Sequence, residues 1–334
     1  MKTFLFTLIA LGILITTVSP QQFKKPLPII DMHLHAERAN AQGAPPVPIC
    51  APFPFWPERD PGASPLDYAI NFRQKPVCTN PLWSPMTDQE IMNQSLEVLE
   101  RRNITAVTSG SLDLVQQWKQ AKPDRIIPAL LFSAKNGPPI GNLRQWVKDG
   151  KVAVFGEMVD QYQGIAPDDP SYEPYLALAE ELDIPVGIHI GTGPPGAPYL
   201  AAQPTRYRAR LHSPLSLEEP LTRHPRLRVY VMHAGWPMLD DMLAMLYAHP
   251  HLYVDVGVIV YVLPRAEFYR YLQRLVEAGF GRRVMFGSDQ MIWPQAIEKA
   301  IESIENAPFL SEQQKRDIFY NNAARFLRLD NMGK

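Results

Sequence analysis

Two histidines separated by one residue end the first apolar run of the sequence, residues 29–35. In an extended strand the imidazoles of His33 and His35 project from the same face, a spacing that suits two ligands of one metal ion. A half-buried strand with two unrelated histidines would carry the same pattern. Whether the two histidines bind a metal or have a structural role therefore depends on which residues end the other apolar runs of the chain.

Four later apolar runs also end in a side chain that can bind a metal, namely Glu157, His189, His233 and Asp289. Nitrogen and oxygen ligands without thiolate suit zinc, manganese or iron, and open coordination positions would admit water. A single histidine on an apolar face is more often a hydrogen-bonded core residue. Four histidines and two carboxylates, each at the end of an apolar run, favour a metal centre instead.

The apolar runs are rich in Val and Ile and alternate with helical patterns, as expected for parallel strands that are buried on both faces. Eight of them, with no Gly-x-Gly-x-x-Gly turn after the first, predict a (β/α)8 TIM barrel rather than an open doubly wound sheet. In such a barrel the functional groups lie at the carboxyl ends of the strands, where the candidate ligands fall. The strands are expected at residues 26–35, 104–109, 125–132, 152–158, 184–190, 228–233, 252–258 and 283–289.

The helical segments between the strands carry recognisable start and stop signals. Thr87 and Glu90 form a capping box that opens the first helix. No linker to a second domain is present, so residues 21–334 are expected to form a single domain. Helices are predicted at residues 87–102, 112–121, 142–148, 170–182, 215–222, 238–248, 265–278, 295–305 and 311–329.

A long stretch after the first strand, residues 39–85, has little periodicity and contains eleven prolines. We expect it to contain no helix and no central strand, because prolines at this density disfavour both. It is either a lid over the site or a surface excursion with its own small aromatic core. Cys50 and Cys78 lie within it and either remain buried thiols or form a disulfide, which would stabilise the fold by about 3–4 kcal/mol.

The first twenty residues resemble a secretory signal peptide, with Lys2 before an apolar run at residues 4–15. This run is shorter than the roughly 17–25 residues needed to span a bilayer, although an uncleaved interfacial anchor stays open. We therefore expect an enzyme of the periplasm or the secreted fraction, without a stable membrane span once the signal is removed. Lys plus Arg number 33 against 34 Asp plus Glu, without a basic block, so nucleic acid is not an expected partner.

Four motifs resemble the amidohydrolase superfamily, and most closely its amidohydrolase-related branch, which includes aromatic-acid decarboxylases, hydratases and lactonases. They are Ile-Asp-Met-His-Leu-His at 30–35, Val-Met-His-Ala-Gly at 231–235, Val-Met-Phe-Gly-Ser-Asp at 284–289 and Asn-Ala-Ala-Arg-Phe-Leu at 322–327. The resemblance spans the chain from the first strand to the last helix, apart from the proline-rich stretch. It is specific for the superfamily and leaves the reaction open.

The resemblance implies a role for each ligand candidate. His33, His35 and Asp289 would hold the more buried metal, with His189 as a ligand or a near neighbour. His233 would bind a second metal or polarise the carbonyl of the substrate. Asp289 would also take a proton from the attacking water and pass it to the leaving group.

Glu157 decides how many metals are expected. Some members of the superfamily carry a bridging carboxylated lysine on the fourth strand, others a glutamate, and the single-metal decarboxylases need neither. Glu157 fits a bridge between two metals, but a carboxylate that only orients a ligand or caps the next loop would look the same.

Several further residues are weaker candidates. Asp31 is expected to share a strand face with the two histidines, as a buried hydrogen-bond acceptor below them. Trp236 would stack on a planar substrate or pack in the core or against the lid. One of three arginines near Tyr207 would grip a substrate carboxylate, or all three pair with surface charges. The arginines are Arg206, Arg208 and Arg210, and the histidines expected to be structural are His212, His224, His249 and His251.

The leading prediction is a metal-dependent hydrolase that cleaves an amide, ester or lactone bond of a small carboxylated or aromatic molecule. Its cofactor would be one or two divalent ions, with Zn²⁺ ahead of Mn²⁺ and Fe²⁺. The alternative is a single-metal decarboxylase or hydratase that acts on an aromatic or unsaturated acid. A binding protein without catalysis is a third reading, and the sequence leaves open whether the chain forms a homo-oligomer.

Overall fold

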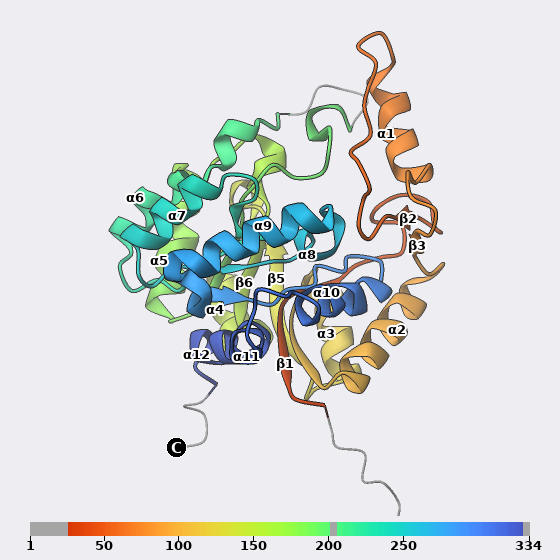
Figure 1. Cartoon of the computed structure of the whole chain (residues 1–334). Coiled ribbons are helices and arrows are strands. Elements are labelled where there is room, and N and C mark those ends of the chain that lie inside the picture. Colours follow the sequence, from red (N-terminus) through yellow and green to blue (C-terminus); the bar gives the residue numbers. More distant parts are fainter. Residues whose placement is uncertain (1–25, 201–205, 330–334) are drawn as a thin grey trace, which may run out of the picture.

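The computed structural model describes residues 26–200 and 206–329, so the expected leader at residues 1–20 lies outside the described part (Figure 1). Eight strands form one sheet in which neighbours follow one another along the chain and every pairing is parallel. The strands are β1 (Ile29–Ala36), β4 (Ile104–Gly110), β5 (Ile126–Phe132), β6 (Val154–Met158), β7 (Val186–His189), β8 (Val229–Met232), β9 (Tyr253–Asp255) and β10 (Val284–Met285).

Backbone hydrogen bonds join the last strand region to the first and close the sheet. Met32 N donates to Phe286 O at 2.9 Å, and Asp289 N donates to His33 O at 2.6 Å. The predicted TIM-like barrel of eight parallel strands is thereby confirmed. Each expected strand is present, although β10 is shorter than predicted because residues 286–289 leave the regular ladder to reach β1.

Helices surround the barrel on its outer side (Figure 1). The capping box at Thr87 starts the first of them as predicted. The expected helix at 311–329 is divided by a π-helical turn at Asp317–Asn321. The helices of the barrel are α2 (Asp88–Arg101), α3 (Leu112–Ala121), α4 (Ile140–Lys148), α5 (Glu173–Glu181), α6 (Glu218–Arg223), α7 (Leu239–Ala248), α8 (Ile259–Val262), α9 (Arg265–Leu275), α10 (Gln295–Glu305), α11 (Glu312–Arg316) and α12 (Asn322–Leu327).

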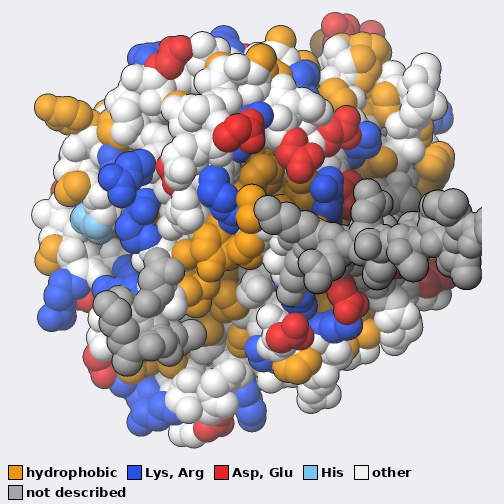
Figure 2. All heavy atoms as spheres, turned by 60° about the horizontal axis from the view of Figure 1, so that its bottom comes forward, with side chains coloured by type: hydrophobic (Ala, Val, Ile, Leu, Met, Phe, Trp, Pro, Cys, Tyr) orange, Lys and Arg blue, Asp and Glu red, His pale blue; other side chains and the backbone are white. Residues whose placement is uncertain are grey.

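The barrel interior is filled with side chains on the side away from the candidate ligands. Ile30, Met32 and Tyr230 pack there with other strand residues and with Phe326 of α12. A Cβ at Gly187 would lie 2.5 Å from the Tyr230 ring, so the absence of a side chain makes room for the tyrosine. Figure 2 shows the face at which the strands begin, where hydrophobic side chains gather among Lys and Arg side chains. The candidate ligands come from the opposite end of the barrel.

The proline-rich stretch is ordered and contains a helix, so the expectation that it holds none was wrong. Helix α1 (Pro65–Gln74) begins with Ser64 as N-cap and Pro65 at its first turn, a position where a helix tolerates proline. The next ten residues contain no proline. A short antiparallel pair, β2 (Pro48–Ile49) and β3 (Leu82–Trp83), holds the ends of the stretch together.

A disulfide joins Cys50 to Cys78, which settles the open choice between a bridge and two free thiols. It closes a loop with a sequence separation of 28 residues that contains all of α1. A loop of this length corresponds to about 3–4 kcal/mol of stabilisation in the chain-entropy model.

Within residues 26–200 and 206–329, none of the helices combines the length and the apolar character needed to cross a membrane.

Candidate metal centre and active-site cavity

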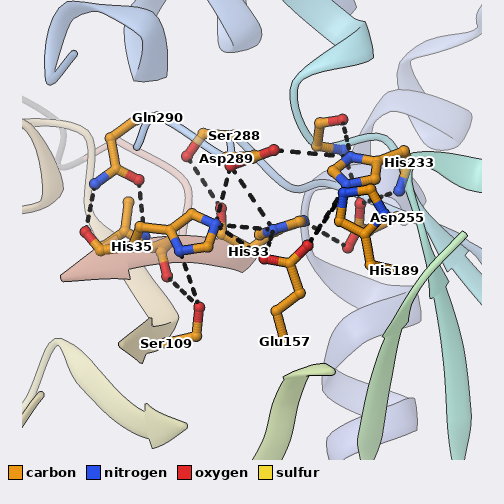
Figure 3. A network of polar contacts seen from close by, with 12 residues as sticks. His33, His35, Ser109, Glu157, His189, His233, Asp255, Ser288, Asp289 and Gln290 are labelled. Carbon is orange, nitrogen blue, oxygen red and sulfur yellow. Dashed lines mark hydrogen bonds and ion pairs between the residues drawn. The ribbon is translucent and has the colours of Figure 1, made fainter. Parts of the chain in front are cut away.

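The six predicted ligands meet at the carboxyl end of the barrel, and all six are buried (Figure 3). His33 and His35 belong to β1, Glu157 to β6 and His189 to β7. His233 directly follows β8, and Asp289 lies beyond β10. The sequence therefore placed the whole set correctly in space, because parallel strands of a closed barrel end around one axis.

The first ligand group consists of His33, His35, Asp289 and one oxygen of Glu157. The Nε2 atoms of the two histidines are 3.1 Å apart, and Asp289 Oδ1 lies 3.0 Å from His35 Nε2 and 3.8 Å from His33 Nε2. Glu157 Oε2 lies 3.5 Å from His35 Nε2 and 3.8 Å from His33 Nε2.

The second ligand group consists of His189, His233 and the other oxygen of Glu157. Glu157 Oε1 lies 3.5 Å from His189 Nε2 and 3.7 Å from His233 Nε2. The two imidazole rings are in edge contact, with centroids 4.3 Å apart. Glu157 thus lies between the two groups and presents one oxygen to each (Figure 3).

These residues fit a divalent cation. Ligand atoms about 2.1 Å from one metal lie about 3.0–3.4 Å from one another, close to the separations in the first group. Two ligand atoms, Asp289 Oδ1 and His233 Nε2, are buried without a hydrogen bond, which is costly unless another partner satisfies them. Three sets of such side chains have ligand atoms within 4.8 Å of one another, and two of these sets share Glu157.

The electrostatics of the cluster keep its carboxylates ionised. Burial raises the pKa of Glu157, but the surrounding histidines outweigh it and hold this pKa well below its usual range. The pKa of Asp289 is lowered in the same way, mainly by His33 and His35 against the effect of burial. Both groups can therefore act as anionic ligands at neutral pH.

The histidines respond to the same charges in different ways. Burial lowers the pKa of His33 and of His35, but Asp289 and the other nearby carboxylates outweigh it, so both values are raised. Burial and the neighbouring His233 lower the pKa of His189 to about 3. His189 is therefore neutral. Burial lowers the pKa of His233, but Glu157 and Asp289 outweigh it, so this value is raised as well. A bound cation would therefore have to displace protons from His233 and from the pair on β1.

Local backbone features aim these side chains at the axis of the barrel. The pairing of β1 with β4 shifts register between Asp31 and Leu34, which breaks the simple alternation expected for the strand. A Cβ at Gly257 would lie 2.6 Å from His33 Nδ1, so only glycine leaves room for the ring. His233 and Asp289 both adopt a positive φ, of 58° and 49°. Non-glycine residues are uncommon in this region and occur preferentially at functional sites.

Asp31 is a buried acceptor, as predicted. Its Oδ1 accepts hydrogen bonds of 2.9 Å from the backbone amides of His33 and Ser288. Burial raises its pKa to about 6, against the effect of those hydrogen bonds. Asp31 therefore links β1 to the strand end that carries Asp289.

A cavity of about 670 Å³ opens above the ligands and includes His35, Glu157, His189, His233 and Asp289 in its wall. The rest of its lining is largely apolar and aromatic. This lining includes Val47, Ile49, Phe53, Trp56, Phe72, Tyr162, Tyr207, Trp236, Ile259 and Trp293. A cavity of this size and character suits a small organic molecule.

Comparison with protein families identifies the family of the chain. The model of the family described as amidohydrolase matches residues 30–329, which is nearly the whole described chain. The chain belongs to the amidohydrolase family. The buried histidines and carboxylates of this amidohydrolase form its candidate metal site.

Solved structures support the fold. An uncharacterised TIM-barrel protein from Bordetella bronchiseptica is 18% identical with a TM-score of 0.58, over 91% of this chain and 100% of that one. A probable 2-pyrone-4,6-dicarboxylic acid hydrolase from Acinetobacter baumannii, with citric acid bound, is 14% identical with a TM-score of 0.56, over 90% and 100%. A 5-carboxyvanillate decarboxylase from Novosphingobium aromaticivorans, with bound manganese, is 14% identical with a TM-score of 0.54, over 72% and 84%. A comparison with curated proteins finds no match.

The three predicted substrate arginines of the amidohydrolase do not reach the cavity. Arg206, Arg208 and Arg210 are exposed, whereas Tyr207 is buried and lines the cavity wall. Arg208 has an extended backbone, in which successive side chains point to opposite sides. The inward position of Tyr207 therefore turns Arg208 outward, and none of the three arginines is among the described residues that line the cavity.

Trp236 does line the cavity, as one of its two predicted roles requires. Its indole nitrogen donates a hydrogen bond of 3.0 Å to Glu267 Oε1, which fixes the ring. The side chain is only partly buried, as expected for a residue of the cavity wall.

Sequence reasoning missed several residues that hold the ligands in place. Asp255 Oδ2 lies 3.2 Å from His33 Nδ1, and its Oδ1 accepts from the backbone amide of His233. The amide group of Gln290 bonds both backbone groups of His35, at 2.9 and 2.7 Å. The amide nitrogen of Gln161 lies 3.0 Å from His189 Nε2. Of these residues, only Asp255 could have been singled out from the sequence, because it is a charged residue within an otherwise apolar strand.

His212 is buried and packs on Tyr207, as the structural role predicted for it requires. Burial lowers its pKa to about 4, against a hydrogen bond to the backbone of Gln161 that raises it. Between pH 6.5 and 4 the unfolded chain binds a proton at this position that the folded chain excludes. The stability contributed by neutral His212 is thus complete above pH 6.5 and is lost as the pH falls toward 4.

We expect wild-type protein to lose roughly 2–3 kcal/mol of unfolding free energy through His212 between pH 7.5 and pH 4.5. A His212→Asn variant should be less stable at pH 7.5 but should lose that much less on acidification. Urea unfolding at both pH values measures the difference. Equal acid losses in the two proteins would show that His212 does not carry this effect.

Proposed function

We propose that this amidohydrolase is a metal-dependent hydrolase that cleaves an amide, ester or lactone bond of a small aromatic molecule bearing a carboxylate. The observation that supports hydrolysis is the position of Glu157, whose two oxygens face two separate histidine groups. This arrangement suits a carboxylate bridge between two cations. The apolar, aromatic cavity above the ligands supports a planar substrate.

In the proposed assignment, His33, His35 and Asp289 would hold one cation, His189 and His233 would hold the other, and Glu157 would offer one oxygen to each. A divalent cation bound there would supply a Lewis acid and would lower the pKa of a coordinated water toward 7. Zn²⁺ suits these nitrogen and oxygen donors, and Mn²⁺ is supported by the manganese in the distantly similar decarboxylase.

Asp289 is the residue suited to move the proton. Its carboxylate is ionised and lines the cavity. We assign it as the base that takes a proton from the attacking water and then delivers this proton to the leaving group. The backbone carbonyl of Asp289 accepts a hydrogen bond of 2.9 Å from Tyr261, which holds the residue in place.

His233 faces the cavity beside Asp289, with its Nδ1 2.9 Å from Gly257 O. The contact to this carbonyl makes Nδ1 the protonated nitrogen and directs the lone pair of Nε2 toward Glu157. This tautomer leaves Nε2 able to ligate a metal, so we assign His233 to hold a cation, which would supply a Lewis acid for the carbonyl of the substrate.

A lyase is the second candidate, because the first ligand group is complete without the second. Two histidines, Asp289 and one oxygen of Glu157 offer four donors to a single ion. The solved structures of similar fold also include decarboxylases as well as hydrolases. In this case the chain would act on an aromatic or unsaturated acid and would need no second cation.

Metal content separates the two candidates. For the hydrolase we expect protein purified without added metal, then titrated with Zn²⁺ or Mn²⁺, to bind about two ions per chain. The loaded protein should release acid from aromatic esters, amides or lactones and no CO₂ from aromatic acids. One ion per chain together with CO₂ release would overturn the hydrolase and support the lyase.

Three further features remain proposals. The leader at residues 1–20 and the disulfide, which is typical of oxidising compartments, support an exported enzyme. The proline-rich stretch is proposed as a lid because several of its side chains line the cavity. Assembly into a homo-oligomer is the third.

A further inference from the structure

A chain of aromatic rings runs from the proline-rich stretch to the metal cluster. Tyr68 and Phe72 of α1 are stacked with ring centroids 6.4 Å apart, and Phe72 stacks on Phe53 at 6.1 Å. Phe53 contacts Trp56 at 5.2 Å, and Trp56 contacts Trp236 at 6.4 Å. Because Trp236 follows His233 by three residues, this aromatic wall ends beside the second ligand group.

The aromatic wall borders the cavity along most of its length, since all of its rings except Tyr68 line it. Flat apolar rings favour a flat apolar ligand, through burial of apolar area and through stacking. The wall therefore offers a place for the body of a planar substrate whose reacting group lies at the metal cluster.

Arg73 lies next to Phe72, in the last turn of α1, at the rim of the same cavity. Among the described residues that line the cavity it is the only arginine, and none is a lysine. The carboxylates in that wall are Glu37, Glu157 and Asp289. Glu157 and Asp289 belong to the ligand groups at the ends of the barrel strands, whereas Arg73 belongs to α1 in the proline-rich stretch.

Within the described ranges Arg73 takes part in no ion pair or side-chain hydrogen bond. Arg59, also in the proline-rich stretch, instead bonds Ala63 O and lies over the Tyr199 ring. The backbone that carries Arg73 is held firmly, because Ser64 caps α1 and the disulfide closes the loop around it. An unpaired guanidinium on an ordered helix is suited to grip a carboxylate with two parallel hydrogen bonds.

We infer that Arg73 binds a carboxylate of the substrate, at the end of the cavity away from the reacting bond. This inference rests on the proposed function and adds to it the residue that binds the carboxylate of the substrate. The substrate is a planar aromatic acid derivative, with the reacting group at the metal cluster, the ring along the aromatic wall and a carboxylate at Arg73. The proline-rich stretch thus supplies both the surface and the charge that select it.

A pair of matched probes tests the inference by binding alone. Isophthalate carries two carboxylates on one ring, and 3-carbamoylbenzoate replaces one of them with a neutral amide of the same size. With zinc-loaded wild-type protein we expect isophthalate to bind about tenfold more tightly, measured by calorimetry or by quenching of tryptophan fluorescence. Arg73→Gln should remove this preference, and Arg73→Lys should keep part of it.

Arg210→Gln is the matched control, because it removes an equally exposed arginine outside the cavity lining. It should bind both probes as the wild type does, and all variants should bind the same amount of zinc. Equal binding of the probes by wild-type protein, or an unchanged preference in Arg73→Gln, would overturn the inference. Since this test needs no turnover, a preference that depends on Arg73 would stand even if no ester or amide were hydrolysed.

Discussion

Replacing Asp289 by asparagine is expected to lower kcat for hydrolysis by about 10³-fold or more, while the barrel stays folded. The amide has the same shape but cannot accept a proton at neutral pH. Asp289 suits this role because its pKa is lowered by His33 and His35 against the effect of burial, so it is ionised before water attacks. The variant also loses the negative charge 3.0 Å from His35 Nε2, so weaker metal binding is expected in addition.

The measurement is kcat at saturating metal and substrate, with the metal content of each sample determined in parallel. Asp124→Asn makes the same chemical change on the surface, since the side chain of Asp124 is 73% exposed, and should leave kcat unchanged. Full metal loading with lost turnover would assign the proton transfer to Asp289. Turnover close to that of the wild type, at equal metal loading, would remove Asp289 from the catalytic step.

The barrel and the clustering of the six candidate ligands could be predicted from sequence for one physical reason. Strands buried on both faces must be apolar along their length, so a polar side chain where such a run ends is conspicuous. His189 and His233 stand out in this way, and the closed barrel then brings them together. The prediction needed only the order of the strands and no detail of packing.

Other parts of the site depend on contacts that sequence periodicity does not record. The shift of register within β1 decides where Asp31 points, and the hydrogen bonds of Gln290 to His35 join residues 255 positions apart. Helix α1 was missed because the count of prolines was averaged over a stretch in which they are unevenly spread. Arg73 was overlooked for the same reason, since its position on the cavity rim depends on that helix.

Replacing Glu157 by glutamine is expected to remove about one bound metal ion per chain and to lower kcat by at least about 100-fold. A glutamine keeps one carbonyl oxygen but presents an NH₂ group where the other carboxylate oxygen was, and NH₂ cannot ligate a cation. The NH₂ group then stands either at the position of Oε2, beside His33 and His35, or at that of Oε1, beside His189 and His233. One of the two histidine groups therefore loses the oxygen ligand that Glu157 supplies. The second ligand group has fewer donors and should be the one to lose its ion.

Glu37→Gln is the control for this experiment, because Glu37 is another carboxylate of the cavity wall and its Oε1 lies 4.0 Å from His35 Nδ1. It makes the same carboxylate-to-amide change without touching the bridge, so its metal content should equal that of the wild type. Metal analysis after dialysis, with thermal unfolding to confirm the fold, gives the result. Two ions in Glu157→Gln would mean that Glu157 does not bridge. One ion in both the variant and the wild type would mean that the second histidine group holds no cation. This result would support the lyase, which needs no second cation.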